Sequence, residues 1–236
     1  MASKRDYLHQ QWEPIRKVLR FLMSHVGFRY LAKIDSVEGA EMVPEKGPGI
    51  IMFNHIAFID GIAILSALKR NAVPLVKNEA GAIPLWGIFP ALWGAIPIRR
   101  GEVDRQALEQ ALAVLNSGEL LLIAPEGHRS PALIEGKEGL AYIAARTKAP
   151  IIPVVIDGSE GFPTLDPKRW SLPGARIRFG KPFRFRLPKG RIPHVWLRKM
   201  TDEAMYRLAS LLPPARRGVY GDLRCATTET IEFLTP

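Results

Sequence analysis

Short apolar runs alternate with helical stretches from residue 48 onward. This alternation predicts an α/β domain. Continuous apolar strands are typical of a parallel sheet that helices cover on both faces. We therefore expect a single α/β domain with a largely parallel central sheet flanked by helices. The strands are expected at 49–53, 73–76, 95–98, 120–123 and 151–156, and the helices near 59–70, 80–92, 102–116 and 137–148.

The pattern changes in the last third of the chain. Residues 176–179 and 183–187 alternate apolar and basic side chains, as a pair of edge strands would. A last helix is expected at about 194–212, because Pro213 and Pro214 follow it. The remaining residues are polar and weakly patterned. We expect an N-terminal amphipathic helical segment at 1–34, an α/β domain at 35–213 and a C-terminal tail at 214–236.

Residues 9–30 predict an amphipathic helix. Two interpretations of it stay open: a basic amphipathic helix at a chain end is typical of an interfacial membrane anchor, and the same stripe would also pack on the domain. The stripe consists of Trp12, Ile15, Leu19, Leu22, Met23 and Val26, and the basic residues expected on other faces are Arg16, Lys17 and Arg20.

Residues 80–98 carry no charge and are long enough to cross a membrane. Three prolines and three glycines interrupt the segment, however, and both residue types oppose a straight helix. We expect a short buried helix, a turn and a buried strand. The interrupting residues are Pro84, Pro90, Pro97, Gly81, Gly87 and Gly94.

The charge of the chain indicates which kinds of partner it binds. Thirty-three Lys and Arg against 23 Asp and Glu leave a net charge of +10, which favours an anionic membrane surface, a phosphorylated substrate or nucleic acid. Cys225 is the one cysteine, so no intrachain disulfide forms and a reducing compartment fits best. The polar N-terminus does not resemble a secretory signal. We expect a cytoplasmic location.

His55 and Asp60 form the first candidate site. His55 directly follows an apolar strand, and in α/β sheets ligands bind at the carboxyl ends of strands. An imidazole takes a proton from a hydroxyl near neutral pH, and a carboxylate on its other nitrogen fixes the tautomer. A helix cap at Asp60 and a polar strand end at His55 would explain the same residues without chemistry.

Two further strand ends carry basic residues. Arg129 and Glu126 follow the strand at 120–123, and Arg99 and Arg100 follow the strand at 95–98. Arginine offers a planar fork of donors that suits a phosphate, and a glutamate accepts a hydrogen bond from a sugar or glycerol hydroxyl. A surface turn with an ion pair would explain them equally well. Five scattered histidines and one cysteine show no metal-ligand spacing.

Together these residues resemble the glycerophospholipid acyltransferase family, of which 1-acylglycerol-3-phosphate acyltransferase is typical. The resemblance covers residues 35–160, and Lys77 falls where the family often has lysine. His128 stands where the family usually has Thr, and Ala57 where it often has a small hydroxyl residue. Four family blocks occur in order: His-x4-Asp at 55–60, Gly-x3-Ile-x-Arg at 94–100, a Glu-Gly-Thr-Arg-like block at 126–129 and a proline-containing apolar block at 150–154.

The resemblance implies a membrane-associated O-acyltransferase with a fold like that of glycerol-3-phosphate acyltransferase. It implies that His55 is the general base and Asp60 its partner. Arginines would bind the phosphate of the acceptor and Glu126 would place its glycerol. The apolar segment at 80–98 would form core or line a slot for the acyl chain. The expected substrate-binding residues are Lys77, Arg99, Arg100, Glu126, Gly127 and Arg129.

The implied reaction moves a fatty acyl group from acyl-CoA or acyl carrier protein to the free hydroxyl of 1-acyl-sn-glycerol 3-phosphate, giving phosphatidic acid in phospholipid biosynthesis. No metal or other cofactor is expected. The protein would act as a peripheral or monotopic protein at the cytoplasmic face of the cell membrane. Two alternatives stay open: another acceptor (a glycolipid, an amino-acid lipid, another lysophospholipid or glycerol 3-phosphate), and a non-catalytic basic module that binds membrane or nucleic acid. The chain has no nucleic-acid-binding motif, so a nucleic-acid partner is not expected.

Overall fold

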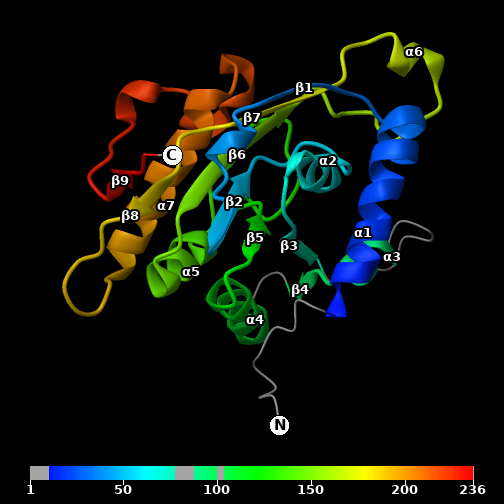
Figure 1. Cartoon of the computed structure of the whole chain (residues 1–236). Helices are drawn as coiled ribbons and strands as arrows, with labels where there is room; N and C mark the ends of the chain where they lie inside the picture. Colours follow the sequence, from blue (N-terminus) through cyan, green and yellow to red (C-terminus); the bar gives the residue numbers. More distant parts are fainter. Residues whose placement is uncertain (1–10, 78–87, 100–103, 236) are drawn as a thin grey trace.

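The computed structural model describes residues 11–77, 88–99 and 104–235. Within these ranges, nine strands form one sheet in the order β1-β7-β6-β2-β5-β3-β4, and β8 joins β6 to β9 (Figure 1). The strands are β1 (Ile34–Glu38), β2 (Gly49–Phe53), β3 (Ala72–Lys77), β4 (Ile96–Ile98), β5 (Leu120–Ile123), β6 (Ile151–Asp157), β7 (Ala175–Phe179), β8 (Phe183–Phe185) and β9 (Ile231–Phe233).

The predicted α/β fold with a largely parallel sheet is confirmed. Five consecutive strands of the sheet, β6, β2, β5, β3 and β4, run parallel to one another. Each corresponds to one of the apolar runs of the sequence, shifted by no more than one residue at an end. The loops after β2, β5 and β6 therefore meet at one edge of the sheet.

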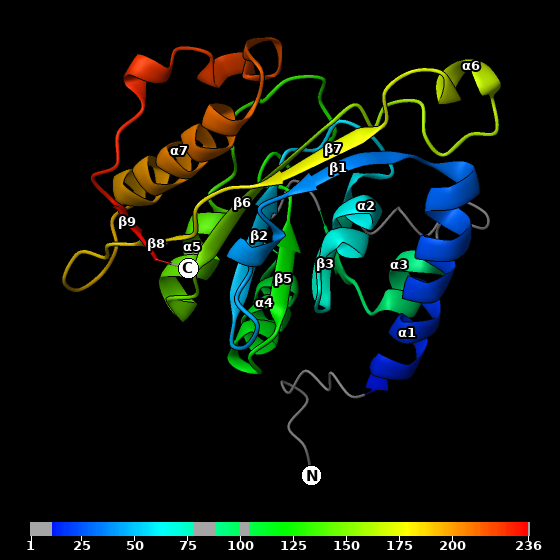
Figure 2. The ribbon, with the colours of Figure 1, turned by 45° about the horizontal axis from the view of Figure 1, so that its top comes forward.

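Helices cover both faces of this sheet (Figures 1 and 2). Ile50 and Met52 of β2 pack into the core beneath one layer of helices, and Ile51 and Phe53 pack into the core beneath the other layer. This arrangement explains why β2 is apolar at every position. The first layer holds α4 (Arg105–Asn116), α5 (Gly139–Thr147) and α7 (His194–Leu211), and the second holds α1 (Glu13–Leu22), α2 (Asp60–Ala67) and α3 (Ile88–Trp93).

The expectation of an edge pair from residues 176–187 is wrong. β7 lies inside the sheet, antiparallel to β6 and parallel to β1, and β8 pairs with β6 and β9. Arg176 and Arg178 are exposed while the alternate residues of β7 are buried, so the alternation itself is real. β1 has no apolar run that would predict it, because three of its five residues are polar and none is fully buried.

The N-terminal helix packs on the domain through arginines. Buried Arg16 donates from Nε to the carbonyl oxygen of Trp93 at 2.8 Å, and Arg20 donates to the Asn71 side chain at 2.8 Å. Two of the three basic residues expected on other faces of the helix, Arg16 and Arg20, therefore point toward the domain. On the outer face of the helix Phe21 is 59% exposed, and neighbouring apolar side chains are exposed as well. Residues Met23–Leu31 continue the helix in π-helical form as η2.

The uncharged segment partly fits its prediction. α3 and β4 are the expected short helix and strand, and residues 78–87 lie outside the described ranges. Gly94 forms the turn between them with a φ of +75°, and a Cβ there would lie 2.7 Å from the Trp12 ring. No helix in the described ranges has both the length and the apolar character that a bilayer crossing requires.

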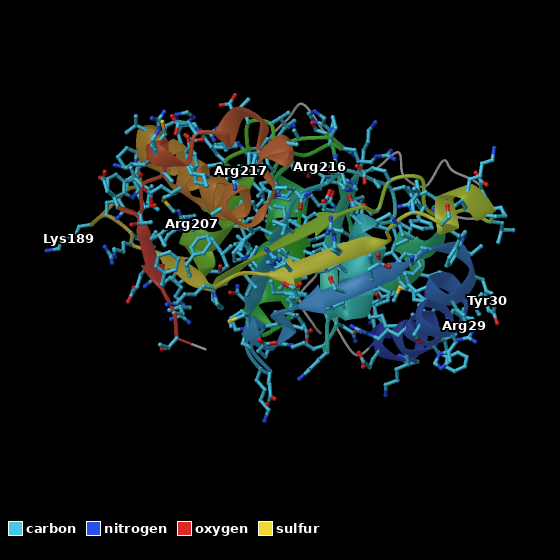
Figure 3. All side chains as sticks on the ribbon, turned by 90° about the horizontal axis from the view of Figure 1, so that it is seen from above. Arg29, Tyr30, Lys189, Arg207, Arg216 and Arg217 are labelled. Atoms are coloured by element: carbon cyan, nitrogen blue, oxygen red, sulfur yellow. The ribbon has the colours of Figure 1, made fainter. Side chains whose placement is uncertain are left out.

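The segment after α7 packs against the domain. It forms three short 3-10 turns, η5 (Pro214–Arg216), η6 (Gly218–Tyr220) and η7 (Leu223–Cys225), before β9. Leu133 donates its backbone N–H to Arg216 O at 2.9 Å and accepts from Val219 N at 3.1 Å. Figure 3 shows Arg216 over the middle of the molecule, between Lys189 at one end and Tyr30 at the other.

We expect Gly218→Ala to detach this segment. Gly218 has a φ of +51°, and a Cβ there would lie 1.9 Å from Leu133 O. Gly190 is the control, since its φ is +82° but no atom lies within 4 Å of its Cβ position. Gly218→Ala should lower the free energy of unfolding by at least about 2 kcal/mol more than Gly190→Ala, measured by urea denaturation. Equal losses would mean that the segment is not held there.

Candidate active site

Asn54 joins the ends of two neighbouring strands. Its Nδ2 donates to Ile156 O and its Oδ1 accepts from Ile156 N, both at 2.9 Å. The side chain is only 2% exposed, so these bonds satisfy a buried amide. Asn54 thereby fixes the starting point of the loop that carries His55.

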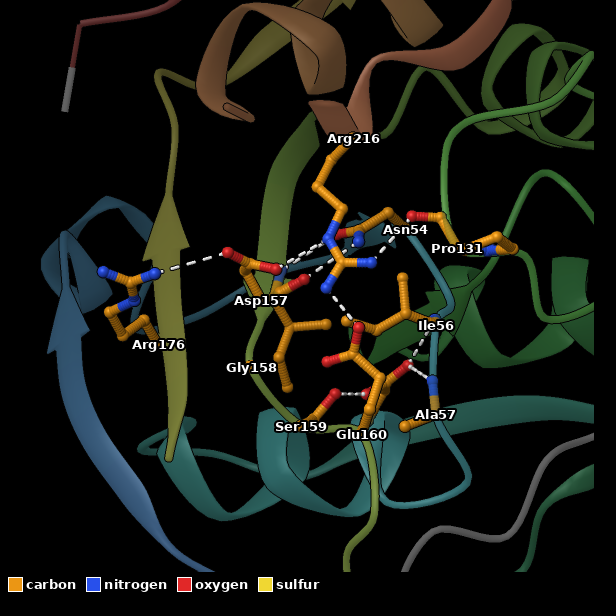
Figure 4. A network of polar contacts seen from close by, with 12 residues as sticks. Asn54, Ile56, Ala57, Pro131, Asp157, Gly158, Ser159, Glu160, Arg176 and Arg216 are labelled. Carbon is orange, nitrogen blue, oxygen red and sulfur yellow. Dashed lines mark hydrogen bonds and ion pairs between the residues drawn. The ribbon is translucent and has the colours of Figure 1, made fainter. Parts of the chain in front are cut away.

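His55 and Asp60 form a hydrogen-bonded pair. His55 Nδ1 lies 2.9 Å from Asp60 Oδ2, and the same oxygen accepts from the backbone N–H groups of Ile56 and Ala57 at 2.7 Å each. Ser159 Oγ donates to Asp60 Oδ1 at 2.5 Å. Figure 4 shows Ser159, on the loop after β6, pointing toward the loop of Ile56 and Ala57.

The geometry suits a general base. The Asp60 carboxylate is fully buried and accepts from Nδ1, so His55 carries its proton on that nitrogen. The imidazole side chain is 23% exposed, and Phe53 packs at its edge with ring centroids 5.6 Å apart. Nε2, which has no hydrogen-bond partner among the described residues, is left to accept a proton.

Glu126 lies beneath His55 as a buried carboxyl group. It is 1% exposed, and its two oxygens accept from the backbone N–H groups of His55 at 3.2 Å and Ile134 at 3.0 Å. Burial raises the pKa of Glu126 to about 7, and the charge of Asp60 acts in the same direction, against the two backbone hydrogen bonds. Both oxygens therefore bind the protein backbone, and the glycerol contact expected from the sequence stays a prediction.

The loop after β5 also carries Gly127 and Arg129. Gly127 adopts a φ of +75°, and the Lys137 side chain lies 3.1 Å from its Cβ position, so glycine fits best. Arg129 is exposed. Its neighbour Ser130 donates its backbone N–H to His55 O at 2.8 Å, which brings the arginine to the loop of the His–Asp pair.

The remaining predicted substrate residues lie farther along the same edge. Lys77 ends β3, opposite Ile98 of β4, and exposed Arg99 follows β4 directly. β4 lies three strands from β2, about 14 Å across the sheet. Arg99 N donates to Asp104 Oδ2 at 3.0 Å. Arg100 lies outside the described residues.

An apolar pocket of about 280 Å³ adjoins the His–Asp loop. Ile59, which directly precedes Asp60, lines it together with Ile62 of α2 and Phe89 of α3. Phe89 belongs to the segment that the sequence predicted as core or acyl slot. The rest of the pocket lining comes from Leu19, Leu22, Met23, Val26, Gly27, Phe28, Leu31, Ala32 and Pro163.

Within the described ranges, His, Cys, Asp and Glu side chains form no cluster of three that could hold a metal.

Sequence reasoning missed Ser159 and Arg216. Gly158 and Ser159 follow the apolar strand β6, at the same sheet edge as His55, and that position was the available signal. Arg216 lies in the segment expected to be a tail, and no local pattern indicates its contacts. Its Nε donates to Asp157 Oδ1 at 2.8 Å.

Glu126 should make stability depend on pH. Its pKa is about 7 when folded against an ordinary 4.5, so its stabilising effect is complete below pH 4.5 and is lost as the pH rises through about 7. We expect the wild type to lose stability relative to Glu126→Gln between pH 5 and 8, measured as the difference in Tm. Glu109→Gln, an exposed control on α4, should follow the wild-type profile. Parallel profiles for wild type and Glu126→Gln would contradict the buried titration.

Comparisons with known proteins agree with this geometry. The family model described as Acyltransferase matches residues 36–157. A 1-acyl-sn-glycerol-3-phosphate acyltransferase alpha of Mus musculus is 28% identical over 167 residues, 67% of this chain and 57% of that protein. A 1-acyl-sn-glycerol-3-phosphate acyltransferase of Borreliella burgdorferi is 30% identical over 130 residues, 53% of this chain and 52% of that protein. The match thus spans less than two thirds of each relative.

A solved structure shares the fold. The crystal structure of the 1-acyl-sn-glycerophosphate (LPA) acyltransferase PlsC from Thermotoga maritima aligns with a TM-score of 0.57 at 23% identity, covering 97% of this chain and 86% of that one. The family match includes the His–Asp pair, Glu126 and Arg129, whereas Ser159 and Arg216 lie beyond its end. By this match over more than half of its length, the chain belongs to the acyltransferase family.

Proposed function

We propose that the protein transfers a fatty acyl group from a thioester carrier to the free hydroxyl of 1-acyl-sn-glycerol 3-phosphate, giving phosphatidic acid. The observation that carries this proposal is the hydrogen bond of 2.9 Å between His55 and the buried Asp60. The names of the Mus musculus and Borreliella burgdorferi relatives support the choice of acceptor. The carrier is acyl-CoA or acyl carrier protein.

In the proposed mechanism His55 acts as general base. Its Nε2 takes the proton of the acceptor hydroxyl as that oxygen attacks the thioester carbonyl. Asp60 holds the ring through Nδ1 and stabilises the imidazolium that forms. The proton then passes to the departing thiolate. A thioester is already activated, so this proposal needs no metal or other cofactor.

The acyl chain is proposed to enter the apolar pocket beside Ile59. The pocket lies between η2 and the start of α2, and its lining is almost entirely apolar. Ile59, which lines the pocket, directly precedes Asp60 in the sequence. A chain lying there would therefore have its carbonyl end close to the His–Asp pair.

The phosphate of the acceptor is proposed to bind the basic residues at the sheet edge. Arg129 supports this best, because it is exposed and its loop bonds to His55 O. Arg100, Arg99 and Lys77 are further phosphate-binding candidates from the neighbouring strand ends. Guanidinium groups bind phosphate through paired hydrogen bonds, which would orient the glycerol hydroxyl toward His55.

The membrane side of the molecule is proposed to be the outer face of α1 and η2. Val18 is 57% exposed, Phe21 59% and Tyr30 57%, and Arg29 lies beside Tyr30 (Figure 3). Apolar side chains flanked by basic ones are typical of helices that lie in a membrane interface. The net charge of +10 would strengthen attachment to an anionic surface. We propose peripheral or monotopic attachment at the cytoplasmic face.

Another acceptor remains the second candidate. His128 is exposed in the loop after β5, in place of the family's usual Thr. An imidazole there would offer a different hydrogen-bonding group to the headgroup. A panel of lysophospholipids, glycolipids, amino-acid lipids and glycerol 3-phosphate with labelled acyl-CoA separates this candidate from the first, by mass spectrometry of the products.

His55→Ala should lower the rate of acyl transfer by about 10²- to 10⁴-fold, the contribution of a general base. The variant should still fold, because the backbone contacts of His55 and the three other donors to Asp60 remain. Release of the free thiol from acyl-CoA measures the rate. His194→Ala is the matched control, since His194 forms an exposed pair with Glu138 at 3.1 Å. Wild-type turnover in His55→Ala would remove this residue from the mechanism.

Arg129→Ala should reduce kcat/KM for the phosphorylated acceptor by roughly 10- to 100-fold, the value of hydrogen bonds to a charged group. The same substitution should barely affect the slower reaction with a 1-acylglycerol that lacks phosphate. Arg146→Ala, on the exposed side of α5, serves as the charge-matched control. Equal losses with both acceptors would rule out a phosphate contact.

A further inference from the structure

Arg216 occupies the junction of two loops at the active-site edge. It lies on η5, and its side chain is only 23% exposed. Its Nε donates to Asp157 Oδ1 at 2.8 Å, its Nη1 donates to Pro131 O at 2.9 Å, and its Nη2 binds the Glu160 carboxylate. All three nitrogens of the guanidinium are therefore engaged with the protein (Figure 4).

One of these loops, the loop after β6, binds the side chain of Asp60. Asp157 and Glu160 flank Ser159, and the Ser159 hydroxyl donates to Asp60 Oδ1 at 2.5 Å. Within the described residues this is the only hydrogen bond to Oδ1, while Oδ2 accepts three. Arg216 thus binds the loop on both sides of Ser159, and the Ser159 hydrogen bond fixes the rotation of the Asp60 carboxylate.

The other loop, at 130–134, binds the backbone of His55. Pro131 follows Ser130, whose backbone N–H donates to His55 O at 2.8 Å. Leu133 donates its N–H to Arg216 O at 2.9 Å, immediately before Ile134, which binds Glu126. The backbone and the side chain of Arg216 therefore both contact this loop.

We propose that Arg216 is a positioning residue for the His55–Asp60 pair, acting through Ser159 on one side and through the loop at 130–134 on the other. This inference rests on the proposed function of the pair. It gives the segment after α7 a part in acyl transfer, although that segment lies outside the residues that the family model matches.

The contacts distinguish positioning from direct substrate binding. Two carboxylates, Asp157 and Glu160, already face the guanidinium, and Asp157 also pairs with Arg176 at 3.4 Å. A guanidinium neutralised in this way has little attraction left for a phosphate. A planar fork is required to reach three acceptors at once, and an ammonium group at the end of a lysine does not reproduce that geometry.

The test compares Arg216→Lys, Ser159→Ala and the double variant by steady-state kinetics. We expect each single substitution to lower kcat on the order of 10- to 100-fold, with the KM values for donor and acceptor within about twofold of wild type. Because Arg216 acts partly through Ser159, the double variant should lose much less than the product of the two single effects. Ser159→Thr, which keeps the hydroxyl, should recover activity.

Two controls separate positioning from simple destabilisation. Arg224→Lys changes an exposed arginine of the same segment, paired with Asp222, and should leave kcat unchanged. The downfield NMR resonance of the His55 Nδ1 proton, identified by its absence in His55→Ala, should shift or broaden in Arg216→Lys and Ser159→Ala. A lower Tm with unchanged kcat and an unchanged resonance would overturn the inference.

Other outcomes also decide the matter. A rise in KM for the phosphorylated acceptor alone, with kcat unchanged, would make Arg216 a substrate ligand and overturn positioning. If the wild type transfers no acyl group to 1-acyl-sn-glycerol 3-phosphate, the proposed function itself fails. If His55→Ala is inactive while Arg216→Lys and Ser159→Ala retain wild-type kcat and resonance, the proposed function stands and only this inference fails.

Discussion

The burial of the Asp60 carboxylate is the constraint on which the active-site edge depends. An ion with no access to water costs several kcal/mol unless hydrogen bonds compensate it. Four donors do so here: the His55 ring, two backbone amides of the following residues and the Ser159 hydroxyl. These donors come from two loops separated by about a hundred residues of sequence. Any arrangement that satisfies Asp60 therefore brings the loop after β6 against the loop after β2 and orients the imidazole at the same time.

The second buried carboxyl group shows how the same edge treats a different role. Among the residues that the structure describes, Glu126 receives two hydrogen bonds, both from backbone amides, and the charge of Asp60 adds to the effect of burial in raising its pKa. A carboxyl group that accepts a proton near neutrality can lie under His55 without placing a second full charge there. The backbone of His55 is held from below by Glu126 while its ring is held from the side by Asp60.

The predictable features of this protein are the ones that local patterns encode. The central strands were predictable because both sheet faces are buried, so each strand is a continuous apolar run. The His–Asp pair was predictable because its spacing is short and follows such a strand. β1 and β9 were not, because each is short and largely exposed. Ser159 and Arg216 were not, because their meaning depends on partners at sequence separations of 99 and 59 residues.

The docking of α1 explains why apolar side chains remain on its outer face. Arg16 and Arg20 donate to backbone carbonyls and to Asn71 at partly or fully buried positions, and Arg20 stacks near Trp93. Rolling the helix to bury Phe21 would break the buried hydrogen bond of Arg16 and the partly buried ones of Arg20, which together cost more than the burial of one ring gains. The arginines therefore determine which face of α1 turns outward. η2 continues from α1 and lines the pocket beside Ile59. The exposed apolar face is therefore fixed in position relative to the His–Asp pair.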